Sequence, residues 1–337
     1  MLFNSSQHAV VLGAGSWGTA LGMVLSEFFD KVTLIGRCPE QCAEINSFHT
    51  NNNYLPRVQL PKNIAASVVY QETKDAALIL FVLPTSATRE AATELATIGI
   101  PATTPLVSCS KGIERGSGIR MSEIISELLP NNPIAVHSGP THAEEVSAHL
   151  ASAAVVGSQN LELAASLQTV FTTSYFRTYT SDDVAGIELG GALKNVFAIA
   201  AGIISGIGLG DNAIAALVTR GLAEMTRLGI ALGGRPETFS GLSGIGDLMV
   251  TCYSSHSRNN RVGKALGSGE TLEEVTERLG MVAEGVPNTL SIYEAARKHD
   301  IETPIINAVY QILYEEKPAQ EALVELLTRD LKPEISQ

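Results

Sequence analysis

Short apolar runs recur through the first half of the chain, separated by stretches long enough for a helix. The run at residues 76–83 is continuous, as expected of a strand that is covered on both faces. Residues 16–29 instead have the apolar period of a helix. The predicted strands are residues 8–13, 31–36, 76–83, 105–109 and 133–137. Strands that alternate with helices predict βαβ units and a doubly wound, mainly parallel sheet.

The pattern changes to long helical periods from about residue 182, and no strand-like segment follows. Thr271 and Glu274 have the spacing of a capping box, and Pro304 suits the first turn of a helix. The predicted helices are residues 182–205, 211–232, 271–279, 284–299, 304–316 and 319–329. We therefore predict an α/β Rossmann domain at residues 1–185, followed by an all-helical domain at residues 186–337.

The 337 residues include 23 Lys and Arg against 35 Asp and Glu, which gives a net charge of −12. An acidic chain argues against general nucleic-acid binding, and 45% hydrophobic residues suffice for a sizeable core. The cysteines have no paired zinc-site spacing, so neither a disulfide framework nor a metal site is expected: Cys38, Cys42, Cys109 and Cys252. Residues 1–7 lack a signal-peptide pattern, and the apolar segment 196–209 is too short to span a bilayer. We expect a soluble cytoplasmic protein.

A glycine motif, G-x-G-x-x-G, directly follows the first predicted strand and opens the first predicted helix. Its glycines are Gly13, Gly15 and Gly18, with Ser16 and Trp17 between them. Glycines permit a tight turn and close approach of backbone to a pyrophosphate, which the helix N-terminus then attracts. The motif predicts a dinucleotide cofactor.

Arg37 stands where many NAD sites carry an acidic residue, just after the second predicted strand. A guanidinium can form a forked pair with the 2′-phosphate of NADP. We therefore expect NADPH to be preferred, with NADH possible.

Lys194 lies in an otherwise apolar helical segment, one turn after Gly190 and Gly191. Burial lowers the pKa of a lysine, which suits the amine for proton exchange with a substrate hydroxyl or carbonyl. A surface lysine that extends to solvent is the alternative interpretation. Lys111 follows the predicted strand at residues 105–109, whose carboxyl end faces the ligand crevice.

Two further segments carry candidate chemistry. Thr141 and Glu144 have capping-box spacing, and His142 between them is a weaker candidate for a catalytic base. Asp247 and Thr251 follow a glycine-rich stretch, where Asp247 could bind a substrate hydroxyl or orient Lys194. The run Ser257, Arg258 and Asn259 suits a phosphate near a helix start, and an acidic chain needs such local cations to hold an anion.

Six motifs in this order resemble those of the bacterial NAD(P)-dependent glycerol-3-phosphate dehydrogenases. They are GAGSWGTA at 13–20, SKGIE at 110–114, GPTHAEE at 139–145, ELGGALKNV at 188–196, GLSGIGDL at 241–248 and SRNNRVG at 257–263. The resemblance implies a Rossmann domain, a helical substrate domain and a homodimer. It also implies interconversion of dihydroxyacetone phosphate and sn-glycerol 3-phosphate for phospholipid synthesis.

The resemblance assigns roles by position. Lys194 would exchange the proton, and Lys111 would touch both cofactor and substrate. Further substrate contacts would be Gly139, Thr141, Asp247, Ser257, Arg258 and Asn259. Cofactor contacts would be Gly13, Gly15, Ser16, Trp17, Gly18, Arg37, Ala143, Arg258, Val282 and Glu284.

Two other functions stay open at this point. A β-hydroxyacid dehydrogenase shares the domain order and a helical lysine, but has an asparagine three residues later, where this chain has Phe197. A non-catalytic sensor of NADP(H) would bind the cofactor without turnover, and would have no need of Lys111, Lys194 and Arg258.

Overall fold

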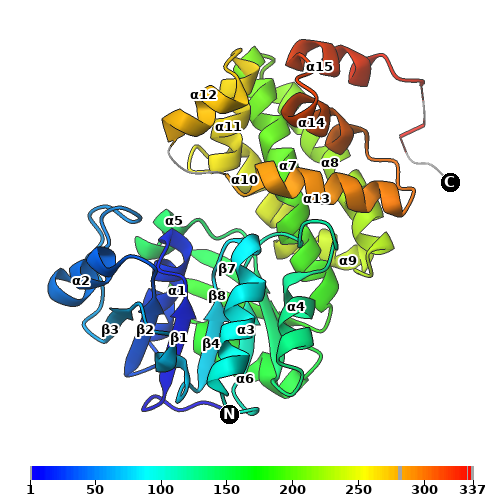
Figure 1. The fold of residues 1–337 in the computed structure, drawn as a ribbon. Helices are drawn as coiled ribbons and strands as arrows, with labels where there is room; N and C mark the ends of the chain where they lie inside the picture. Colours follow the sequence, from blue (N-terminus) through cyan, green and yellow to red (C-terminus); the bar gives the residue numbers. More distant parts are fainter. Residues whose placement is uncertain (1, 280–282, 332, 335–337) are drawn as a thin grey trace.

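The computed structural model describes residues 2–279, 283–331 and 333–334. One eight-stranded sheet, of order β3-β2-β1-β4-β5-β6-β7-β8, forms the lower part of the molecule in Figure 1. The strands are β1 His8–Leu12, β2 Lys31–Ile35, β3 Ile64–Ser67, β4 Leu78–Phe81, β5 Leu106–Ser108, β6 Ile134–Ser138, β7 Ser152–Gly157 and β8 Phe176–Ser181. Neighbours are parallel except β6 and β7. The predicted mainly parallel sheet is confirmed.

Helices accompany the sheet and then take over the chain. The first group is α1 Ser16–Ser26, α2 Pro39–Phe48, α3 Thr88–Ile98, α4 Met121–Leu128, α5 Ala143–Ser147 and α6 Leu161–Phe171, with short helical turns η1 Tyr70–Thr73 and η2 Thr85–Ala87. The second group is α7 Val184–Ile207, α8 Asp211–Ala231, α9 Pro236–Phe239, η3 Leu242–Gly246, α10 Asp247–Tyr253, α11 Arg258–Gly267, α12 Leu272–Leu279, α13 Gly285–Lys298, α14 Pro304–Tyr314 and α15 Ala319–Leu327. The second group lies above the sheet in Figure 1 and confirms the helical C-terminal part. The division at residues 185/186 stays a prediction.

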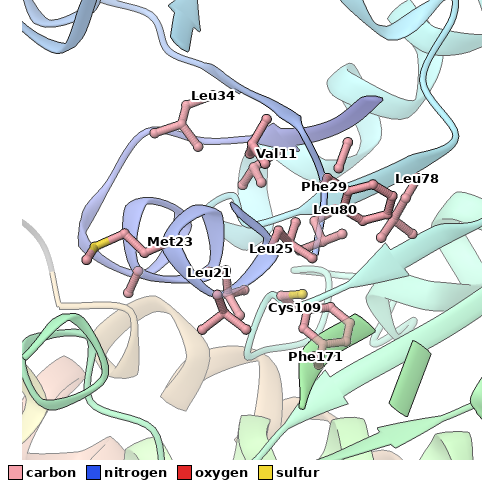
Figure 2. Packing of buried hydrophobic residues seen from close by; sticks show 14 of the residues in the cluster. Val11, Leu21, Met23, Leu25, Phe29, Leu34, Leu78, Leu80, Cys109 and Phe171 are labelled. Atoms are coloured by element: carbon pink, nitrogen blue, oxygen red, sulfur yellow. The ribbon is translucent and has the colours of Figure 1, made fainter. Parts of the chain in front are cut away.

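The sheet is buried on both faces, as the continuous apolar runs require. In β1, Val11 packs in one hydrophobic cluster, while Val10 and Leu12 pack in another. Successive side chains of a strand point to opposite faces, so one strand serves both clusters. Figure 2 shows the first cluster, in which Leu21 and Leu25 of α1 pack with Val11.

Three strands were not predicted from the sequence, because their apolar signal is weak. β3 has the sequence IAAS, and β7 begins with Ser and two Ala residues. β8 is an edge strand in which Phe176 and Thr178 are buried while Arg177 and Tyr179 are exposed. An edge strand with one exposed face alternates in polarity, so it has no continuous apolar run.

Two predicted capping boxes have different outcomes. At α12, Thr271 and Glu274 exchange the expected bonds, with Thr271 Oγ1 accepting from Glu274 N at 3.3 Å. The prediction of a capping box at Thr141 and Glu144 is wrong. Helix α5 begins at Ala143, one residue too late for Thr141 to cap it, and Thr141 Oγ1 donates to Gly139 O at 3.2 Å instead.

Helix α7 is the central element of the helical part. Its 24 residues are long and apolar enough to span a membrane, whereas we expected the apolar segment 196–209 to be too short. The most apolar window of the helix is, however, wholly buried inside the protein. It packs closely on α11, where a Cβ on Gly263 would lie 2.0 Å from Ile199 O, and one on Gly202 would lie 2.1 Å from Asn260 O. Glu188 of α7 also accepts hydrogen bonds from Ser122 N at 2.9 Å and Arg120 Nη1 at 3.0 Å, which ties α7 to the start of α4.

Candidate active site

The glycine loop has the close contacts that the motif predicts. Gly13 has φ +114°, and a Cβ there would lie 2.3 Å from Val82 O. A Cβ on Gly18 would lie 1.9 Å from Gly13 O. Helix α1 then begins at Ser16 without a side-chain cap. Its first N–H groups and the positive end of its dipole therefore fit a pyrophosphate.

Neighbouring segments hold this loop in place. Ser16 Oγ donates to Tyr54 O at 2.9 Å, and the buried Asn51 donates from Nδ2 to Ala14 O at 3.0 Å. The ring of Trp17 packs toward the core, 5.9 Å from the ring of His137. We did not identify Asn51 or Tyr54 from the sequence, where they stand in a polar run without a distinctive motif.

Arg37 is exposed two residues after the end of β2. The pKa of the Tyr70 phenol is raised, chiefly by burial and also by Glu90 and Glu94, and the charge of Arg37 opposes this rise. An exposed guanidinium at this position can reach the 2′ side of an adenosine ribose.

Two lysines share one carboxylate beyond the carboxyl ends of the strands. Lys111, which follows β5, donates from Nζ to Asp247 Oδ2 at 2.7 Å and to Gly139 O at 3.1 Å. Lys194, on α7, is bonded to Asp247 Oδ1 and donates to Thr251 Oγ1 at 2.8 Å. Lys194 is 5% exposed, so the alternative of a surface lysine is wrong. The ion pairs join the sheet to two helices of the C-terminal part.

Burial sets the protonation equilibria of this cluster. It lowers the pKa of Lys194 to about 7, against the opposing charge of Asp247 and with the help of the positive charge of Lys111. The pKa of Asp247 is lowered by Lys111 and Lys194, although burial alone would raise it. An amine with a pKa near neutrality can both give and accept a proton.

A chain of buried, hydrogen-bonded amides contacts the backbone of Lys111. Gly285 N donates to Asn259 Oδ1 at 2.9 Å, and Asn259 Nδ2 donates to Asn195 Oδ1 at 3.0 Å. Asn195 Nδ2 in turn donates to Lys111 O at 3.3 Å. We did not identify Asn195 as a site residue from the sequence, where it is only the residue after Lys194 and helical spacing does not indicate its partners.

The predicted phosphate-binding run lies at the N-terminus of α11. Ser257 is the N-cap residue and accepts from Asn260 N at 3.2 Å. Arg258 reaches the glycine loop, where its Nη2 donates to Ser16 Oγ at 3.3 Å. Asn259 is buried in the amide chain. Arg258 therefore stands between the nucleotide loop and the helical part.

The remaining candidates border the same region. Gly139 has φ +147°, and a Cβ there would lie 2.9 Å from Ala154 Cα. Ala143 is buried at the start of α5. Glu284 accepts from Thr85 Oγ1 at 3.4 Å, and burial raises its pKa. Val282 lies outside the described residues.

The four cysteines are unpaired, and three of them are buried. Burial raises the pKa of Cys252, next to Thr251, to about 12, so it is a thiol at neutral pH. Within residues 2–279, 283–331 and 333–334, no group of three or more His, Cys, Asp or Glu side chains could hold a metal.

Comparisons with known proteins identify the family of the chain. Residues 8–164 match the model of the NAD-dependent glycerol-3-phosphate dehydrogenase N-terminus, and residues 183–324 match that of the C-terminus. The glycerol-3-phosphate dehydrogenase [NAD(P)+] of Enterococcus faecalis is 48% identical over 332 residues, covering 97% of both chains. The crystal structure of glycerol-3-phosphate dehydrogenase from Coxiella burnetii is 40% identical with a TM-score of 0.92, covering 96% of this chain and 99% of that one. This chain therefore belongs to the NAD-dependent glycerol-3-phosphate dehydrogenase family.

Proposed function

We propose that the protein is an NAD(P)-dependent sn-glycerol-3-phosphate dehydrogenase that reduces dihydroxyacetone phosphate reversibly to sn-glycerol 3-phosphate for glycerophospholipid synthesis. The observation that carries the proposal is the buried pair of Lys194 and Asp247 in a helical part whose Arg258 reaches a glycine loop fit for a dinucleotide. The bound reduced nicotinamide supplies the hydride for C2 of the ketone.

Lys194 is the proposed proton donor. As hydride reaches C2, negative charge develops on the carbonyl oxygen, and the ammonium of Lys194 can deliver a proton from Nζ. A pKa of about 7 makes the same amine a base for the reverse reaction. Asp247 and Thr251 occupy two directions around Nζ, and the third hydrogen is left for the substrate.

Lys111 is proposed to stabilise the developing alkoxide. Its ammonium is held by Asp247 and Gly139, and its side chain is 19% exposed, so it borders the crevice without facing bulk solvent. Charge stabilisation is strong in such a water-poor site. Gly139, Thr141 and Ala143 would form the turn around the substrate and the nicotinamide.

The phosphate of the substrate is assigned to the start of α11. Ser257, Arg258 and Asn259 supply a hydroxyl, a guanidinium and an amide there, and Arg258 also reaches Ser16 of the glycine loop. A phosphate held by these groups would place C2 at a fixed distance from Lys194, so binding energy far from C2 would serve the reaction.

The nucleotide is assigned to Gly13, Gly15, Ser16, Trp17, Gly18, Arg37, Lys111, Ala143, Arg258, Val282 and Glu284. Because the Trp17 ring packs inward, its backbone N–H is the group proposed to face the pyrophosphate. The exposed Arg37 supports a preference for NADPH, with NADH accepted. We further propose a cytoplasmic homodimer, which light scattering or analytical ultracentrifugation would test.

The proposal is tested by initial rates with dihydroxyacetone phosphate and each reduced cofactor, followed by the loss of nicotinamide absorbance. We expect turnover with both cofactors and a higher kcat/KM for NADPH. Oxidation of hydroxyisobutyrate or phosphogluconate, without activity on dihydroxyacetone phosphate, would support a β-hydroxyacid dehydrogenase instead. Tight NADPH binding without turnover on any of these substrates would support a sensor.

A further inference from the structure

His142 lies beside the two lysines but has no place in the mechanism proposed above. It is the N-cap residue of α5, three residues after Gly139. Burial lowers its pKa below the usual 6.5, as do the charges of Lys194 and Lys111, while Asp247 acts in the opposite direction. The charges of both lysines and of their shared carboxylate therefore act on this imidazole.

The ring of His142 reaches a second element of the site. Its Nε2 lies 3.4 Å from the carbonyl oxygen of Val250, on α10. A carbonyl can only accept, and an imidazole that is neutral at pH 7 has one N–H, so this contact places the hydrogen on Nε2. His142 is thus a donor to α10.

Val250 occupies a particular position on that helix. It lies between Asp247 and Thr251, whose side chains both contact the amine of Lys194. The turn that carries His142 also supplies Gly139 O, a partner of Lys111. One short segment, residues 139–142, therefore contacts both halves of the arrangement that joins the two lysines.

A second imidazole lies near the ring of His142. The ring centroid of His256 lies 6.0 Å from that of His142, at an angle of 54°. His256 is exposed and directly precedes Ser257, the N-cap residue of α11. The titratable groups that act on or contact His142 are thus Lys194 on α7, Lys111 after β5, Asp247 on α10 and His256 before α11.

We propose that His142 is a positioning residue of the reaction, because its bond to Val250 holds α10, and with it Asp247 and Thr251, in place around Lys194. The inference rests on the proposed function. It requires no contact between His142 and the substrate.

The test uses the full-length protein and a set of variants at this position. His142→Phe keeps a ring but removes the N–H, and His142→Gln returns an amide N–H close to the position of Nε2. His149→Phe is the matched control, since His149 lies just after α5 with its ring stacked on Tyr175 at 4.2 Å. For each protein, kcat and KM for dihydroxyacetone phosphate, the pH dependence of kcat, NADPH affinity and thermal unfolding are measured.

For His142→Phe we expect kcat to fall about tenfold, since small misplacements of reacting groups have large effects on rate. The pH limb of kcat that reports Lys194 should shift, while KM and NADPH affinity stay within about twofold. His142→Gln should recover most of kcat and the wild-type limb, and His149→Phe should behave as wild type.

An unchanged kcat and pH limb in a folded His142→Phe protein would overturn the inference. A raised KM with unchanged kcat would also overturn it, because it would indicate substrate contact. If His142→Phe does not fold, the comparison of His142→Gln with His142→Asn tests the inference. The shorter Asn side chain does not reach Val250 O, so equal kcat in these two variants contradicts the inference. Absence of wild-type turnover on dihydroxyacetone phosphate would instead contradict the proposed function.

Discussion

Lys194 and Asp247 form an ion pair in which both side chains are almost fully buried, with exposed fractions of 7% and 1%. Burying two charges costs free energy, and a pair of this kind persists where each charge has further polar partners. Thr251 and Lys111 provide them. The pair thus keeps an amine of lowered pKa in a defined position, which is what proton transfer to a substrate requires.

Lys194→Met should lower kcat for reduction of dihydroxyacetone phosphate by about 1000-fold, since it removes the proposed general acid. NADPH affinity should change little, because the glycine loop is untouched. Steady-state rates and fluorescence titration measure the two quantities. Lys264→Met, at an exposed position of α11, is the control. Near-normal turnover of Lys194→Met would exclude Lys194 as the proton donor.

Asp247→Asn should shift the pH dependence of kcat. The charge of Asp247 raises the pKa of Lys194 against burial, so its removal should lower that pKa further below about 7. The ammonium form is needed for reduction, so the alkaline limb of the kcat profile should move to lower pH. A profile measured from pH 5 to 9 would show this, and an unmoved limb would mean that Asp247 does not control Lys194.

Arg37→Ala should change cofactor preference. Loss of the guanidinium should raise the KM for NADPH about tenfold and leave the KM for NADH nearly unchanged, since only NADPH carries the 2′-phosphate. Arg177→Ala, at an exposed position of β8, is the matched control. Equal effects on both cofactors would argue that Arg37 has no role in discrimination.

His137 should make the stability of the fold sensitive to acid. Its ring is fully buried among Trp17, Phe171 and Phe176, and burial lowers its pKa to about 3. The unfolded chain takes up this proton near pH 6.5, so the contribution of His137 to stability is present above pH 6.5 and is lost as the pH falls toward about 3.

The variant His137→Leu should therefore weaken the dependence of the unfolding midpoint on pH between 6.5 and 5. Thermal unfolding followed by circular dichroism at several pH values measures the slope. His299→Leu, just after α13, serves as the control. If His137→Leu and wild type lose stability equally between these pH values, the buried imidazole is not the source of the acid sensitivity.

Gly263→Ala should destabilise the helical part by about 3 kcal/mol, because a methyl group cannot enter a packed contact without backbone shifts. The added Cβ would lie 2.0 Å from Ile199 O on α7. Urea denaturation measures the loss, and Ser268→Ala, at the exposed C-cap of α11, should change stability by less than about 0.5 kcal/mol. Wild-type stability of Gly263→Ala would show that α7 and α11 separate easily.

Sequence patterns predicted the parts of this fold that depend on local signals. Continuous apolar runs located β1, β2, β4, β5 and β6, and the glycine motif located the nucleotide loop. β8 escaped because its polarity alternates at the sheet edge, and the helical turn α9 because four residues carry no period. The failed cap at Thr141 shows that a two-residue pattern does not fix where a helix begins.

The candidate site was predictable only as far as chemistry marks individual residues. Lys194 was identifiable because a charge in an apolar helix is unusual, and Arg258 because a cation followed by amides suits a phosphate. Asn195 had no such mark, and nothing in the run that contains Asn259 indicated its hydrogen bond to Asn195, 64 positions away along the chain. Their juxtaposition arises from the packing of α7 on α11, which no local pattern encodes.

In the sequence, Lys111 precedes the last strand of the sheet, β8, and Asp247 follows that strand by many residues. A nascent chain could thus complete its sheet and nucleotide loop while its two lysines still lack their counter-charge. A product truncated before Asp247 would retain the glycine loop but lack the carboxylate that contacts both lysines, so premature termination would leave the proposed proton donor without its partner.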